Sequence, residues 1–164
     1  MSVIDWIRSL QSKPSEHADT QTVLRIVKEL DRLEPQRARF LAAFAYVLSR
    51  VANADEGISD VETEAMIDIV EHKGRIPRPQ AALVVEIAKH QNQLFGGTED
   101  YLVTREFKAI STEEERRELL DCLFVVSAAD SGISHVENVR MQQIASELGF
   151  AIEDYVRARL ALRL

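Results

Sequence analysis

Four acidic residues lie at two matching places in the sequence and have the chemistry to bind a divalent cation. Asp55 and Glu62 are seven positions apart, and Asp130 and Glu137 repeat this pair 75 positions later. Two carboxylates on either side of a sharp corner can point at one cation, and backbone carbonyls and water can complete its oxygen shell. The pattern therefore predicts a site for Ca²⁺, Mg²⁺ or Mn²⁺ at these four residues.

The residues around these acids repeat as well. The segment 54–62 recurs at 129–137 with a constant offset (130 − 55 = 75), and the register continues without an insertion to Gly74 and Gly149. Such a repeat is typical of a duplicated unit, here a helix, a corner and a second helix. We expect residues 40–74 to superpose on residues 115–149.

The same acids also have a purely structural interpretation. In each copy a serine, Ser59 or Ser134, precedes the glutamate by three positions, which predicts a capping box at the start of a helix. Asp55 and Asp130 end the preceding helix, where a negative charge costs about 0.3–1 kcal/mol, but an aspartate can also accept backbone N–H bonds and stabilise the turn. Metal binding and capping are both open interpretations.

The spacing of apolar residues predicts helices along the whole chain, and no stretch has the strict alternation typical of a strand. We expect an all-α, single-domain bundle of about eight helices. Ser111 and Glu114 predict a further capping box. The expected helices cover residues 3–10, 20–32, 35–55, 59–74, 79–94, 101–107, 111–130, 134–149 and the segment from 153.

The helix that begins at Pro35 has the widest apolar stripe, which indicates burial on more than one side. We expect it to be the central helix of the first half. The helical period places Val61, Ala65, Met66 and Ile69 on the inward face of their helix, and Tyr155, Val156 and Leu160 on the inward face of the last helix.

Residues 3–10 form an amphipathic segment with Trp6 on its apolar side. Docking on the domain is the favoured interpretation, and contact with a membrane surface is the alternative. We divide the chain into residues 1–33, a lead-in, and residues 34–164, the main helical domain.

Composition excludes several classes of function. The net charge of −7 and the pI near 5.2 disfavour nucleic acid as a partner. Cys122 is the only cysteine, so no disulfide can form within the chain, which suits a reducing cytoplasm. No apolar stretch approaches the roughly 20 residues that span a bilayer.

Motifs for catalysis are missing from the sequence. It contains no Gly-rich phosphate loop, no nucleophile elbow and no Cys/His pairing, and paired carboxylates alone are weak evidence for acid/base chemistry. We expect a protein that is not an enzyme. A scaffold or adaptor that holds an unknown protein partner is the alternative to cation binding.

The two corners resemble those of the tellurite-resistance TerB family. The matching part runs from about Phe40 to Tyr155: a helix that ends in Ala-Asp, a glycine-containing corner, an Ile-Ser step and a glutamate that opens the next helix, twice over. The resemblance implies a cytoplasmic all-helical module linked to stress response or metal-ion handling, with no established catalysis. For Asp55, Glu62, Asp130 and Glu137 it implies an acidic surface for divalent cations or partners.

Overall fold

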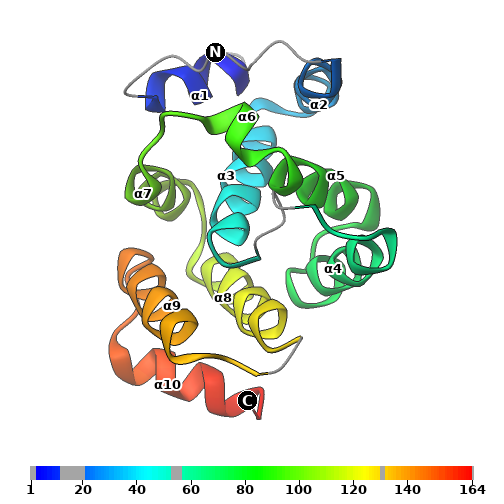
Figure 1. Cartoon of the computed structure of the whole chain (residues 1–164). Coiled ribbons are helices and arrows are strands. Elements are labelled where there is room, and N and C mark those ends of the chain that lie inside the picture. Colours follow the sequence, from blue (N-terminus) through cyan, green and yellow to red (C-terminus); the bar gives the residue numbers. More distant parts are fainter. Residues whose placement is uncertain (1–2, 12–20, 53–56, 130–131, 164) are drawn as a thin grey trace.

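The computed structural model describes residues 3–11, 21–52, 57–129 and 132–163, and these residues form ten helices (Figure 1). The all-α prediction is confirmed, and the helices number ten in this part of the chain rather than about eight. The helices are α1 (Val3–Leu10), α2 (Gln21–Asp31), α3 (Pro35–Ala52), α4 (Asp60–Lys73), α5 (Arg78–Lys89), α6 (Gln91–Phe95), α7 (Asp100–Ile110), α8 (Glu113–Ala128), α9 (His135–Glu147) and α10 (Ile152–Ala161).

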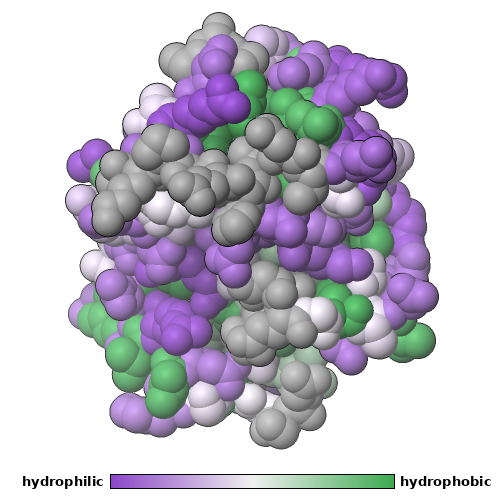
Figure 2. Space-filling model, turned by 45° about the horizontal axis from the view of Figure 1, so that its top comes forward, coloured by the Kyte–Doolittle hydropathy of each residue, from purple (hydrophilic) through white to green (hydrophobic). Residues whose placement is uncertain are grey.

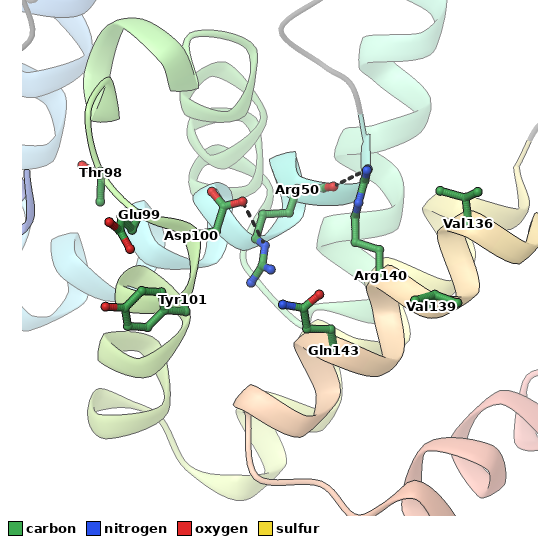
Figure 3. Close-up of a pocket in the computed structure, with 9 residues that line it drawn as sticks. All are labelled: Arg50, Thr98, Glu99, Asp100, Tyr101, Val136, Val139, Arg140 and Gln143. Atoms are coloured by element: carbon green, nitrogen blue, oxygen red, sulfur yellow. Dashed lines mark hydrogen bonds and ion pairs between the residues drawn. The ribbon is translucent and has the colours of Figure 1, made fainter.

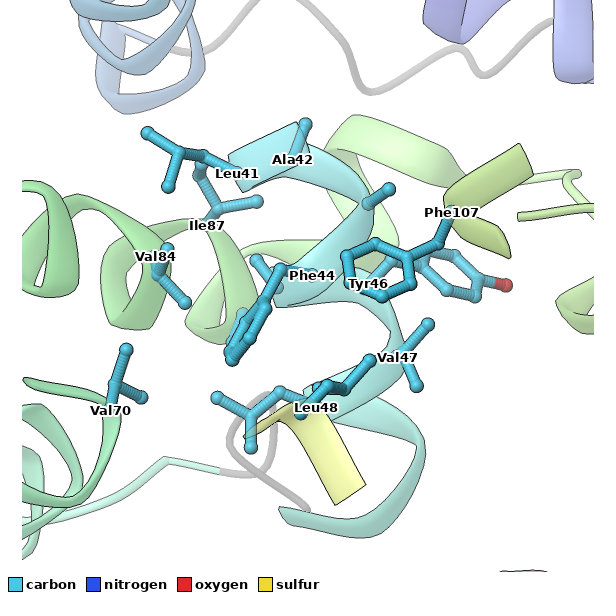
Figure 4. Packing of buried hydrophobic residues seen from close by; sticks show 14 of the residues in the cluster. Leu41, Ala42, Phe44, Tyr46, Val47, Leu48, Val70, Val84, Ile87 and Phe107 are labelled. Carbon is cyan, nitrogen blue, oxygen red and sulfur yellow. The ribbon is translucent and has the colours of Figure 1, made fainter. Parts of the chain in front are cut away.

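Helix α3 lies at the centre of the domain, with α5, α7 and α8 packed around it (Figure 1). From Phe40 to Leu48 every side chain of α3 is buried, as its wide apolar stripe predicts. Phe44 packs edge-on against Phe107 of α7, with ring centroids 6.1 Å apart, and Leu41 lies near Ile87 of α5 (Figure 4). The helix is thus central to the whole domain and not only to its first half.

Helix α1 docks on the domain. Val3, Trp6 and Ile7 are buried, and the helix packs against α2, α3 and α6. This burial agrees with the docking interpretation of residues 3–10. None of the helices in the described part of the chain is long and apolar enough to cross a membrane.

The single helix expected over residues 79–94 is two helices. The chain breaks at His90 (φ −118°, ψ 25°), which ends α5 and precedes α6. The His90 N–H donates to the carbonyl of Ile87, a tightened last turn that does not continue as α-helix.

The capping box at Ser111 and Glu114 is a wrong prediction, because the box is one residue later. Thr112 Oγ1 accepts from the N–H of Glu115 at 3.1 Å, and the Glu115 carboxylate accepts from the N–H of Thr112 at 2.8 Å. Ser111 instead ends α7, and its hydroxyl donates back to the carbonyl of Phe107.

Two helices are rotated relative to the prediction. In α4 Met66 is buried as expected, but Val61 is 80% exposed and Ala65 is exposed too, because Ile67 and Val70 take the inward positions. In α10 Tyr155 is buried as expected, whereas Val156 and Leu160 are 47% and 68% exposed. The inward face of α10 is completed by Ala158.

The single cysteine lies where α8 packs against the end of α4. Cys122 is fully buried, and a Cβ atom placed on Gly74 would lie 3.2 Å from its Sγ and 3.1 Å from the Phe44 ring. Burial raises the pKa of the Cys122 thiol, with Asp121 and Glu118 adding to the effect. Gly74 is therefore required for close packing at this junction.

Candidate functional site

The two corners have the same backbone geometry in the residues that the structure describes. Gly57 and Gly132 both adopt a positive φ, 86° and 89°, a region that favours glycine. A Cβ atom at either position would meet nothing within 4 Å, so both corners are open to solvent. The predicted superposition of residues 40–74 on 115–149 stays a prediction, because residues 53–56 and 130–131 lie outside the described residues.

The two serines cap their helices as predicted. Ser59 Oγ accepts from the N–H of Glu62 at 3.1 Å, and Ser134 Oγ accepts from the N–H of Glu137 at 3.1 Å. The Glu137 carboxylate also accepts from the N–H of Ser134 at 3.2 Å, which completes the box. The Glu62 carboxylate accepts from the Ser59 hydroxyl instead, so the predicted capping box is complete only in the second copy. Both glutamates thus stabilise helix starts.

The other two predicted cation ligands, Asp55 and Asp130, lie outside the described residues. Among the residues that are described, no group of three or more His, Cys, Asp or Glu side chains is placed to hold a metal ion. The acidic residues of α4 form ion pairs with an arginine of α5. Arg78 lies 2.7 Å from the carboxylates of Glu64 and Asp68 and 3.1 Å from that of Glu71.

A hollow of about 800 Å³ lies between the first turn of α7 and helix α9 (Figure 3). We call it the α7–α9 groove. Tyr101 lies on the α7 side, and four side chains of α9 lie on the other, with Arg50 from α3 between them. The residues used below are Arg50, Asp100, Tyr101, Val136, Val139 and Arg140.

Arg50 fixes the floor of the groove. Its side chain is only 8% exposed, and its two terminal nitrogens donate to the Glu147 carboxylate at 3.0 and 3.3 Å. It also donates to Thr104 at 2.8 Å, and its Nε lies 3.7 Å from the Asp100 carboxylate. One buried guanidinium therefore joins α3, α7 and α9, and the paired geometry with Glu147 is the stronger kind of ion pair.

A tyrosine extends this network. The Tyr46 hydroxyl donates to the Asp100 carboxylate, and its ring packs edge-on against Phe95 with centroids 4.9 Å apart. Burial raises the pKa of Tyr46, and the neighbouring Asp100 adds to the rise. Tyr46 is consequently held protonated as a structural donor.

The rim of the groove is exposed and partly apolar. Tyr101, Val136 and Val139 are 50%, 66% and 51% exposed. Arg140 lies beside the two valines on α9, and it donates to the backbone carbonyl of Arg50 at 3.2 Å (Figure 3). A cation at this place also stabilises the last turn of α3.

Sequence analysis did not identify the groove. One signal was available, because Arg50 lies in the most buried helix of the chain, directly before buried Val51. A buried arginine needs an acidic or hydrogen-bonding partner, but the sequence does not show that Asp100 and Glu147 are the partners of Arg50.

Comparison with known proteins supports the family suggested by the corners. No curated protein and no solved structure matches the chain. A family model described as "Tellurite resistance protein TerB" matches residues 40–160, which span both corners and the α7–α9 groove. Because the match covers most of the sequence, the chain belongs to the TerB family.

Proposed function

We propose that this TerB domain is a cytoplasmic, non-catalytic binding module of the stress response that holds a segment of a partner protein in the α7–α9 groove. The observation that carries the proposal is the exposed apolar rim above a rigid, ion-paired floor. Exposed apolar side chains gathered at one hollow are typical of protein-binding sites. A floor that is already fixed by ion pairs loses little conformational entropy when a partner binds.

The chemistry of the rim indicates what the segment contains. Val136 and Val139 offer apolar contacts, and the Arg140 guanidinium beside them can pair with a carboxylate. We therefore expect a short segment in which apolar side chains accompany an aspartate, a glutamate or a free carboxyl terminus.

Two buried side chains that could act as nucleophiles, Cys122 and Tyr46, fit a non-catalytic role. Cys122 and Tyr46 are both buried, and burial favours their protonated forms. A nucleophile for catalysis needs the opposite, namely access to a substrate and a lowered pKa or an adjacent base.

Selection from a displayed library of random linear peptides tests the proposal. Enriched peptides should shift the amide resonances of the first turn of α7 and of α9. Their affinity should fall at least tenfold with Val139→Asp or Arg140→Glu, since one loses apolar contact and the other reverses the charge. Arg105→Glu, an equal charge change on an exposed part of α7 outside the groove, is the control. Peptides that map elsewhere, or that bind all variants equally, would contradict the proposal.

Cation binding at the corners is the second candidate function. It is favoured by the two solvent-open corners with matched glycine geometry, Gly57 and Gly132. Melting curves with millimolar Ca²⁺, Mg²⁺, Mn²⁺ or Zn²⁺ test it: a bound ion raises the melting temperature, and Asp55→Asn with Asp130→Asn removes that rise. A melting temperature that no ion changes leaves only the protein-binding proposal.

A further inference from the structure

The last helix has an apolar strip that nothing in the described part of the chain covers. Ile152, Val156 and Leu160 follow one another at intervals of one turn, and they are 53%, 47% and 68% exposed. Helix α10 forms an outer edge of the molecule beside α9 (Figure 1), and hydrophobic residues gather on the lower left of the face drawn in Figure 2, the side on which α9 and α10 lie in Figure 1. Tyr155 and Ala158 hold the helix to the domain, so the strip is free to bind something else.

The charges of α10 are separated along its length. Glu153 and Asp154 lie in the first turn, whereas Arg157 and Arg159 lie in the second half. Arg159 is engaged within the domain, since it donates to Asn138 at 2.9 Å. Arg157 is 76% exposed, and its ion pair with Asp154 at 3.5 Å is a weak surface pair. Glu153 and Arg157 both flank the strip.

We propose that a second copy of this chain covers the strip, with two α10 helices packed antiparallel around a two-fold axis at Val156. The apolar strip is symmetric about Val156, because Ile152 and Leu160 lie four positions to either side. The charge is opposite on the two sides. In an antiparallel two-fold pair, these two properties place apolar residues opposite apolar residues and each charge near its complement in the other copy.

The antiparallel arrangement gives two equivalent ion pairs. At a rise of about 1.5 Å per residue, Glu153 of one copy and Arg157 of the other differ by roughly 3 Å along the helix axis, which an arginine side chain can reach. A parallel two-fold arrangement would place the flanks with Glu153 and Arg157 on opposite sides of the interface, where these two residues could not pair. The charge pattern therefore selects the antiparallel one.

The interface is small. Stable dimers bury about 800 Å² on each partner, which one ten-residue helix does not provide, so we expect a weak dimer that is half dissociated at a concentration on the order of 100 µM. This surface lies outside the α7–α9 groove, and failure of either proposal leaves the other intact.

Sedimentation velocity of the full chain between about 10 µM and 1 mM tests the dimer. The wild-type sedimentation coefficient should rise with concentration, and Val156→Glu should hold it at the monomer value. Val61→Glu is the matched control, because Val61 is 80% exposed on α4 and its replacement should leave the rise unchanged. Melting curves establish that each variant is folded. A wild type that stays monomeric, or a Val156→Glu variant that associates like the wild type, overturns the proposal.

A charge exchange tests the arrangement. Glu153→Arg alone and Arg157→Glu alone should each weaken association at least tenfold, since like charges then meet twice in the dimer. An equimolar mixture of the two variants should associate at least as strongly as the wild type, because one partner is then basic and the other acidic along this flank. A mixture that does not associate rules out the antiparallel pairing.

Discussion

The first helix-corner-helix unit, α3 with α4, and the second, α8 with α9, agree at their corners and differ at their far ends. Gly57 and Gly132 have nearly the same φ, and Ser59 and Ser134 accept the same backbone bond. The glycines that end the units, Gly74 and Gly149, do not share a conformation: Gly149 has a φ of 93°, whereas Gly74 has a φ of −80°.

The two terminal glycines are needed for different reasons. Gly149 provides the left-handed turn that lets the N–H of Phe150 donate to the carbonyl of Ala145 at 2.9 Å, a Schellman motif. Gly74 has no such turn, but a Cβ atom there would lie 2.5 Å from the carbonyl oxygen of Val70. A repeated residue therefore does not imply a repeated physical role.

The largest effect should come from filling the space at Gly74. Gly74→Ala should lower the free energy of unfolding by about 3 kcal/mol, because the added methyl group collides with backbone and with two buried side chains. Gly149→Asn should cost less than about 1 kcal/mol, since asparagine tolerates the left-handed region. Urea denaturation measures both. Equal costs for Gly74→Ala and Gly149→Asn would mean that both glycines serve the same purpose.

The next effect concerns an ion pair that joins the two units, Arg50 of α3 with Glu147 of α9, and that the repeat does not duplicate. The position of Glu147 corresponds to His72 (147 − 75), and that of its partner Arg50 to Val125 (50 + 75). Glu147→Ala should cost about 2 kcal/mol, because it leaves the nearly buried guanidinium with Thr104 and a more distant Asp100.

An exposed cation that contacts the first unit, Arg78 of α5, is the comparison. Arg78→Ala should cost less stability than Glu147→Ala although Arg78 meets three carboxylates of α4, since these ion pairs are exposed to solvent and screened by salt. Raising the salt concentration should reduce the difference in unfolding free energy between the wild type and Arg78→Ala. It should leave the difference between the wild type and Glu147→Ala unchanged.

The helix caps should differ by a smaller amount. Glu137→Ala should cost about 0.5 kcal/mol more than Glu62→Ala, because only Glu137 accepts from the backbone N–H of its serine, whereas Glu62 accepts from the Ser59 hydroxyl. Ser59→Ala and Ser134→Ala should each cost about 1 kcal/mol, since each removes the side-chain acceptor of one backbone N–H. Urea denaturation measures all four variants, and equal costs for the two glutamate variants would contradict this difference.

The last effect is absent near neutral pH and appears only at alkaline pH. Burial raises the pKa of Tyr46 in the first unit and of Tyr155 beside the second, and Asp100 raises that of Tyr46 further. Below about pH 10 both side chains keep their protons in the folded and the unfolded state, so they add no pH dependence. Above it the unfolded chain loses these protons first, and stability should fall by up to about 1.4 kcal/mol per pH unit for each tyrosine. Absorbance of tyrosinate, followed together with unfolding, should show Tyr155 ionising before Tyr46.

Local sequence signals predicted most of the fold. The repeat, the serine-glutamate spacing and the apolar periodicity located the helices and the caps, because these depend on residues within a few positions of one another. The same signals misplaced Val61 and Val156, since the rotation of an amphipathic helix depends on its neighbours. The groove was missed for the same reason: Arg50 and Glu147 are far apart in sequence and meet only through the packing of α3 on α9.

Cys122 is buried where α8 packs against the end of α4, so chemical labelling of its thiol can report when this junction opens. A thiol-specific reagent cannot reach Sγ while Gly74 and Phe44 pack against it, so the labelling rate in native buffer measures how often this junction separates. Comparing that rate with the rate of global unfolding distinguishes two kinds of motion. Equal rates mean that the two units separate only when the whole domain unfolds, whereas faster labelling means that α4 detaches by itself while the α7–α9 groove remains assembled.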